Sequence, residues 1–262
     1  MKNIPIEHIT IDHMRVAQAI QGEGKAVLLL HGWGANISLV WPLAETLVAT
    51  GFRCYALDLP GFGESEDPPH AWSVTDYVDF IIHYLDYHGL QEVFLFGHSF
   101  GGRLGLVLGA EHSQRIKKMA LSDSAGIKQS QPLWIQFRLN AYKKIRDILF
   151  SIGLRPIAEE LQRRYNKRYG STDFQQVSGV MRETLVQVIN QDLTNYAKQV
   201  QSSTLLFWGD QDQDTPLWMG KKLEQLIPDA GLIVHKGAGH YAYLDFLADT
   251  ARIMTYFFQQ EN

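Results

Sequence analysis

The chain has 262 residues, of which 45% are hydrophobic and 20% are charged, a composition typical of ordinary folded domains and unlike that of disordered or low-complexity chains. Its formal net charge of -4 at pH 7 provides no overall positive field to bind a nucleic-acid backbone. The single cysteine, Cys54, excludes an intrachain disulfide and a cysteine-type zinc site, and no apolar run is long enough to cross a bilayer.

The first half of the chain alternates between strand-like and helix-like segments. Two short alternating segments, residues 6–11 and 14–20, flank Asp12-His13 and predict an antiparallel hairpin. Four continuous apolar runs follow, typical of strands covered on both faces, at residues 26–30, 53–57, 93–96 and 119–121. Helix-length segments lie between these runs, at residues 41–50, 74–88 and 101–112. This order predicts an α/β fold with a mostly parallel sheet and helices on both faces.

The alternation stops near Gly126 and resumes with a strand at residues 204–208. A helix at 216–227, a strand at 232–234 and a final helix at 245–258 follow. In the interruption, apolar residues recur at helical spacing, from Trp134 to Leu149 and from Val177 to Ile189. We therefore expect an α/β core formed by residues 1–126 and 196–262, with an inserted helical cap, or lid, at residues 127–195.

The first part of this insertion is basic. Residues 126–170 contain ten Lys or Arg and three Asp or Glu, a local net charge of +7. One interpretation is a set of solvated helix faces on an acidic body, and another is attraction of anionic substrates.

Gly97-His98-Ser99-Phe100-Gly101 fits the pattern G-x-S-x-G, between a predicted strand and a predicted helix. A nucleophile exposed on so sharp a turn requires a strained backbone and neighbours without Cβ, which explains the glycines. A phosphate loop is excluded, because Arg103-Leu104 stands where Lys and Ser or Thr are required. The motif predicts that Ser99 is a nucleophile.

A serine nucleophile needs a base and an acid that orients the base. His240 lies in a glycine-rich loop after the last predicted strand, and Asp210, Asp212 and Asp214 follow the strand before it. The chain order of serine, aspartate and histidine is the one expected for this architecture.

Together these segments resemble the α/β-hydrolase superfamily, and in particular its carboxylesterase-like serine hydrolases. The matching motifs are His31-Gly32-Trp33-Gly34, the stretch from Asp58 to Ser65, the serine motif and the two late loops. The resemblance implies that Ser99 is the nucleophile, His240 the base and Asp212 the acid, with Asp210, Asp214 and Asp123 left as alternatives for the acid. It also implies an oxyanion hole made by the backbone N–H groups of Trp33 and Phe100, a loop-supporting role for His31 and a packing role for His98.

The expected activity is hydrolysis of carboxylic esters that have an apolar acyl or aryl part. Trp33, Trp134 and Tyr241 are the candidate pocket residues. No cofactor or metal is expected, because Thr215 and Lys221 stand where a calcium-binding EF-hand loop requires Gly and Glu.

The alternatives are hydrolysis of carbon–carbon bonds in meta-cleavage products, a non-catalytic ligand receptor of the same fold, and a lyase. We expect a cytoplasmic protein that binds a small-molecule ester, without a nucleic-acid partner or membrane insertion, since residues 1–15 lack the apolar core of a secretory signal. The sequence leaves the oligomeric state open.

Overall fold

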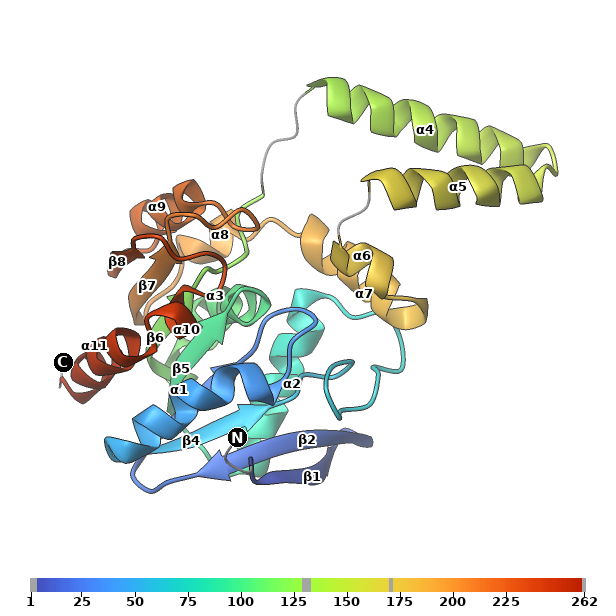
Figure 1. Ribbon diagram of the computed structural model, residues 1–262. Helices are drawn as coiled ribbons and strands as arrows, with labels where there is room; N and C mark the ends of the chain where they lie inside the picture. The colour runs from blue at the N-terminus through green and yellow to red at the C-terminus, as the bar shows by residue number, and fades with distance from the viewer. Residues whose placement is uncertain (1–3, 129–132, 170–171, 261–262) are drawn as a thin grey trace.

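The computed structural model describes residues 4–128, 133–169 and 172–260 (Figure 1). Within these residues, eight strands form one sheet in the order β1-β2-β4-β3-β5-β6-β7-β8. The strands are β1 (Ile6–Ile11), β2 (Met14–Gln21), β3 (Lys25–Leu30), β4 (Phe52–Leu57), β5 (Val93–His98), β6 (Ile116–Ser122), β7 (Ser203–Gly209) and β8 (Ala230–His235). Strands β3 to β8 are parallel, so the predicted mostly parallel sheet is confirmed.

The predicted hairpin is confirmed at the start of the chain. Strands β1 and β2 pair antiparallel, with Ile11 opposite Met14. Asp12 and His13 have positive φ angles of 51° and 66°, the signs required of a two-residue turn that follows the twist of its strands. Strand β2 then pairs antiparallel with β4, which joins the hairpin to the parallel part of the sheet.

Helices cover both faces of this sheet. They are α1 (Ile37–Ala49), α2 (Val74–Tyr87), α3 (Phe100–Glu111), α9 (Leu217–Leu226), the short α10 (Ala242–Asp245) and α11 (Leu247–Gln259). Helix α1 begins four residues before the predicted start, because Asn36 caps it by accepting a hydrogen bond from the backbone N–H of Ser38 at 2.9 Å. The final predicted helix is divided into α10 and α11.

The core therefore has two layers, one on each side of the sheet. On one side, α1 and α11 pack on the strands, and the rings of Phe94 and Phe258 stack with centroids 4.6 Å apart. On the other side, α2, α3 and α9 bury residues such as Tyr77, Leu104 and Leu223. Burial of such side chains is the main stabilising contribution, at about 1.5–3 kcal/mol for each fully buried large one.

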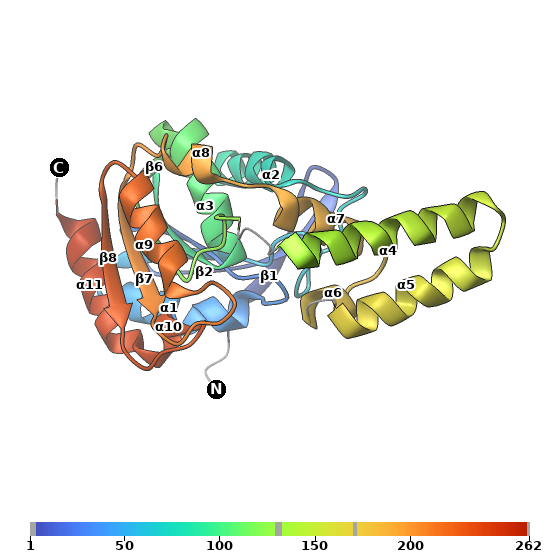
Figure 2. The same cartoon turned by 90° about the horizontal axis from the view of Figure 1, so that it is seen from above.

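Among the residues that the structure describes between β6 and β7, five helices are present. They are α4 (Leu133–Ser151), α5 (Arg155–Tyr169), α6 (Thr172–Gln176), α7 (Gly179–Asn190) and α8 (Thr194–Ala197). The segment returns close to where it left the sheet, since the N–H of Leu193 donates to the carbonyl of Gly126 at 2.9 Å. Helices α4 and α5 form an antiparallel pair that projects from the body in both views (Figures 1 and 2). The division of the chain into a core and a lid stays a prediction.

Among the described residues, none of the helices has both the length and the apolar character that a membrane span requires.

Candidate active site

Ser99 occupies the turn between β5 and α3. Its backbone has φ 51° and ψ -104°, a left-handed conformation that non-glycine residues rarely adopt. A Cβ on Gly97 would lie 2.5 Å from the carbonyl oxygen of Gly101, and one on Gly101 would lie 2.3 Å from the carbonyl oxygen of Leu30. The glycines of the motif therefore allow the strand, the turn and the helix to approach closely enough to expose the serine.

The structure brings Ser99, His240 and Asp212 together in one hydrogen-bonded row. The His240 Nδ1 lies 2.8 Å from Oδ2 of Asp212, and Nε2 lies 3.0 Å from Oγ of Ser99. A carboxylate can only accept, so Nδ1 carries the proton and Nε2 is left to accept the serine O–H. This arrangement can transfer the serine proton to the imidazole.

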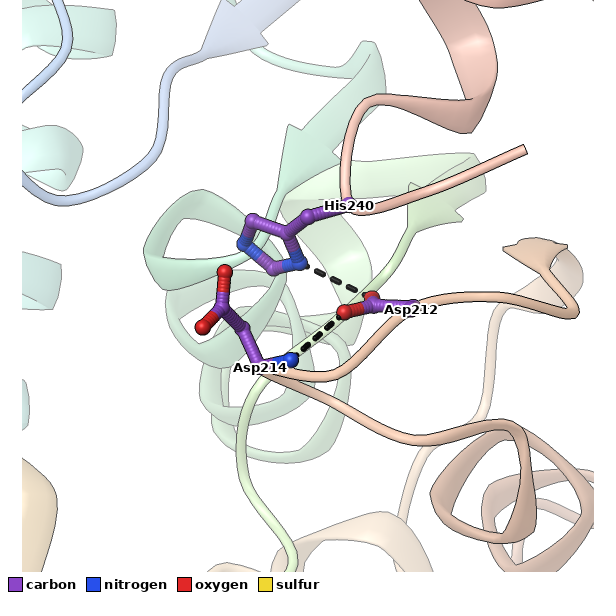
Figure 3. Close-up of side chains that lie close together, drawn as sticks. All are labelled: Asp212, Asp214 and His240. Atoms are coloured by element: carbon purple, nitrogen blue, oxygen red, sulfur yellow. Dashed lines mark hydrogen bonds and ion pairs between the residues drawn. The ribbon is translucent and has the colours of Figure 1, made fainter.

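Asp212 is fixed by the residues that follow it. Its Oδ1 accepts from the backbone N–H of Asp214 at 2.8 Å (Figure 3). The same oxygen accepts from the backbone N–H of Thr215 at 3.0 Å, and the hydroxyl of Thr215 donates to Oδ2 at 2.7 Å. The side chain of Asp212 is fully buried. Because the residues of this turn donate hydrogen bonds to the carboxylate of Asp212, they hold it at a fixed position beside His240.

The electrostatics of this row make it easier for His240 to take up a second proton and for Asp212 to stay ionised. Burial alone would lower the pKa of His240, but the hydrogen bond and charge of Asp212, with further contributions from Asp123 and Asp214, raise it above the ordinary 6.5. Burial alone would raise the pKa of Asp212, but hydrogen bonds from His240 and Thr215 bring it below its ordinary value. The histidine is thus able to accept a proton while the aspartate stays ionised.

Two of the alternative acids have other partners. Asp210 accepts from the backbone N–H of Gly237 at 2.7 Å through its Oδ1. Asp123 is fully buried, and it accepts from the backbone N–H groups of Gly209 and Ala242 at 2.9 and 3.2 Å. Within the part of the chain that the structure describes, neither of these aspartates hydrogen-bonds to His240, whereas Asp212 does.

Two further histidines hold the site's loops. His31 is buried, donates from Nδ1 to the carbonyl of Gly32 at 2.7 Å and accepts from the N–H of Leu59 at Nε2 at 3.0 Å. His98 donates from Nε2 to the backbone carbonyl of His240 at 2.8 Å. Burial, with the nearby charge of His240, lowers the pKa of His98 to about 3, which keeps it neutral.

A cavity of about 600 Å³ opens onto Ser99 and His240. Trp33, Phe100 and Tyr241 line it, and so do Leu185 and Val188 of α7. Phe100 is the first residue of α3, where backbone N–H groups have no intrahelical acceptor. Trp134, which was expected to reach this pocket, does not line it: it lies on α4 with 63% of its surface exposed.

Two charged residues of the cavity wall were not predicted to act there. Arg103 is buried and donates from one guanidinium nitrogen to the carbonyls of Val188 and Gln191, at 2.8 and 2.7 Å, at the C-terminal end of α7. Its sequence signal was a single basic residue among the apolar and glycine residues of Phe100–Glu111. Asp214, weighed only as an alternative acid, lies in the cavity wall beside His240 (Figure 3).

Asp212, Asp214 and His240 also place three ligand-type atoms within 4.8 Å of one another. The oxygens of Asp212 already accept hydrogen bonds from His240, Asp214 and Thr215, and the other nitrogen of His240 faces Ser99. The cluster therefore suits proton transfer better than coordination of an ion.

Two relatives among the known proteins align with most of this chain. Lipase 3 of Moraxella sp. (strain TA144) is 26% identical over 261 residues, which cover 92% of this chain and 79% of that protein. The 2-hydroxymuconate semialdehyde hydrolase of Pseudomonas putida is 28% identical over 248 residues, covering 90% of this chain and 88% of that protein. For two other relatives, the chain spans 33% and 64% of their length.

A solved structure shares the fold. The 2-hydroxy-6-oxo-6-phenylhexa-2,4-dienoate hydrolase from Rhodococcus sp. strain RHA1 superposes with a TM-score of 0.73 at 23% identity, over 98% of this chain and 99% of that one. The family described as alpha/beta hydrolase fold matches residues 25–247, which include the serine turn and both late loops. The chain therefore belongs to the alpha/beta hydrolase fold family.

Proposed function

We propose that the protein is a serine hydrolase that cleaves carboxylic esters. The observation that carries this proposal is the continuous row of hydrogen bonds from Ser99 through His240 to Asp212 at the wall of a cavity. Membership of a hydrolase family and similarity to a lipase support it.

The proposed reaction uses the three side chains of this row and two backbone N–H groups. His240 removes the proton of Ser99 as its oxygen attacks the ester carbonyl, and Asp212 stabilises the imidazolium that forms. The backbone N–H groups of Trp33 and Phe100 hold the negative oxygen of the tetrahedral intermediate. His240 then protonates the leaving alcohol, and a water activated by the same histidine releases the acyl group from Ser99.

We also propose that the acyl or aryl part of the substrate is apolar. Leu185, Val188 and Ile189 of α7, together with Phe100, line the same cavity as Ser99 and His240. These side chains would gain contact area with an alkyl or aryl chain and offer it no hydrogen-bond partner. Because three of them come from α7, this segment acts as a lid that selects the substrate.

The experiment is hydrolysis of p-nitrophenyl esters of increasing acyl length by the wild type and by Ser99→Ala. We expect turnover in the wild type that rises with acyl length and is lost in the variant, which keeps the wild-type unfolding temperature. Folded wild type that cleaves none of these esters, yet decolourises a 2-hydroxy-6-oxo-dienoate, would replace this proposal with carbon–carbon bond hydrolysis. Tight ligand binding without turnover of either would indicate a receptor.

A further inference from the structure

The paired helices α4 and α5, here called the α4–α5 hairpin (residues 133–169), expose large apolar side chains to solvent. Eight of them are between 37% and 76% exposed: Trp134, Phe137, Ile145, Ile148, Phe150, Ile152, Leu154 and Ile157. Contiguous apolar surface of this kind on a folded protein marks a site of interaction.

These side chains form a stripe and a tip. Trp134, Phe137, Ile145 and Ile148 repeat at helical spacing on one face of α4. A different face of α4 packs on α5, where the rings of Tyr142 and Tyr165 stack. The remaining four exposed apolar residues lie at or next to the turn between the two helices, which is the part of the hairpin farthest from the body (Figures 1 and 2).

The same segment is the basic part of the protein. Residues 133–169 carry a formal charge of +6, and because the whole chain carries -4, the rest carries -10. Some of the arginines are paired, Arg146 with Asp147 and Arg164 with Glu160. Lys143 and Lys144 on α4 and Arg155 at the start of α5 are exposed beside the apolar residues.

Exposed apolar residues flanked by Lys and Arg are the composition of helices that lie in a membrane interface. Because the hairpin projects from the body, its tip can enter a fluid lipid layer directly. A protein partner would need a groove that matches the shape of the tip. A second copy could not oppose its own hairpin to this one without bringing two segments of +6 together.

We propose that the α4–α5 hairpin is a docking surface for an anionic lipid bilayer. The basic side chains contact the lipid headgroups, and the apolar tip and stripe enter the boundary between headgroups and acyl chains. The acidic body is repelled by the same lipids, so the protein stands on the hairpin, on one side of the membrane. Docking of the hairpin to a bilayer is independent of ester hydrolysis at Ser99.

The test is flotation of the full chain with vesicles of phosphatidylcholine alone or with about one-third phosphatidylglycerol. Two double variants change the hairpin: Ile152→Ser with Leu154→Ser, and Lys143→Glu with Lys144→Glu. Two variants change matched exposed positions elsewhere: Lys221→Glu with Lys222→Glu on α9, and Tyr256→Ser on α11. The altered side chains are exposed, so all four proteins are expected to unfold at the wild-type temperature.

We expect the wild type to bind the vesicles that contain phosphatidylglycerol, with an affinity that falls as the salt concentration rises. Its affinity for vesicles of phosphatidylcholine alone should be lower by about tenfold or more. Each hairpin variant should lose about tenfold or more in affinity, while the controls bind as the wild type does. Three results would overturn the proposal: no vesicle binding by the wild type, equal loss in the controls, or vesicle-independent dimerisation that the tip variant abolishes. The last would assign the surface to a second copy.

Discussion

The carboxylate of Asp123 accepts a hydrogen bond from the backbone N–H of Ala242, two residues after His240, at 3.2 Å. Its other oxygen accepts from the N–H of Gly209, the last residue of β7, at 2.9 Å. One buried carboxylate therefore connects the loop that carries His240 to the start of the loop that carries Asp212. We infer that Asp123 positions these loops and that Asp212 orients the imidazole.

Asparagine substitutions distinguish these two roles. In Asp212→Asn, the amide no longer holds the imidazole in the tautomer that accepts the serine proton, so kcat for ester hydrolysis should fall by about 10⁴-fold. In Asp123→Asn, an amide nitrogen faces a backbone N–H, so the free energy of unfolding should fall by about 1–3 kcal/mol while kcat changes much less. Urea unfolding and ester kinetics measure both. A larger loss of kcat in Asp123→Asn than in Asp212→Asn would exchange the two assignments.

The acidic limb of the pH–rate profile should depend on Asp214. The negative charge of Asp214 helps to raise the pKa of His240, whose protonated form cannot act as a base. Asp214→Asn should lower that pKa, so kcat/KM should persist to lower pH than in the wild type. Asp245→Asn, at an exposed position, is the control and should leave the limb in place. A limb that stays in place or moves to higher pH in Asp214→Asn would show that Asp214 does not act on His240.

Much of the sheet could be predicted because its strands are short apolar runs separated by helix-length segments, as at residues 26–30 and 93–96. The candidate triad was found for a similar reason: each of its residues lies in a short motif at the end of a strand. Helix α5 was not separately predicted, because nine of its fifteen residues are Arg, Lys, Glu, Gln or Asn and give little apolar periodicity.

Roles that depend on contacts between distant segments could not be predicted. Asp123 reaches Ala242 across 119 positions of sequence, and Arg103 reaches Val188 across 85. Trp134 was assigned to the pocket from its residue type alone, but α4 projects from the body and carries that ring to the surface. Such long-range contacts and the exposure of α4 are set by the tertiary fold and leave no pattern in the local sequence.

Arg103 should be required to hold α7 over the cavity. In Arg103→Met, the carbonyls of Val188 and Gln191 lose a charged donor, which should lower the free energy of unfolding by about 1–3 kcal/mol. KM should also rise, because Val188 and Leu185 line the cavity. Arg103→Lys should recover part of both effects, and Arg252→Met, at an exposed pair with Asp249, should show neither. Wild-type KM and stability in Arg103→Met would contradict this role.

A methyl group at Gly101 should disrupt the serine turn itself. Its carbon would lie 2.3 Å from the carbonyl oxygen of Leu30, and that oxygen belongs to β3, which pairs with β5 immediately before Ser99. Neither strand can move away without losing its place in the sheet, so the start of α3 must shift and carry the serine with it. We expect Gly101→Ala to lower the free energy of unfolding by about 3 kcal/mol.

Gly101→Ala should also lower kcat/KM by about a hundredfold, because a small displacement of Ser99 lengthens its hydrogen bond to His240. The matched control is Gly231→Ala in β8, where the nearest atom to the new carbon is 3.7 Å away. That variant should retain both activity and stability. Wild-type kinetics in Gly101→Ala would mean that the turn adapts to a side chain and that close packing against β3 does not set the position of the nucleophile.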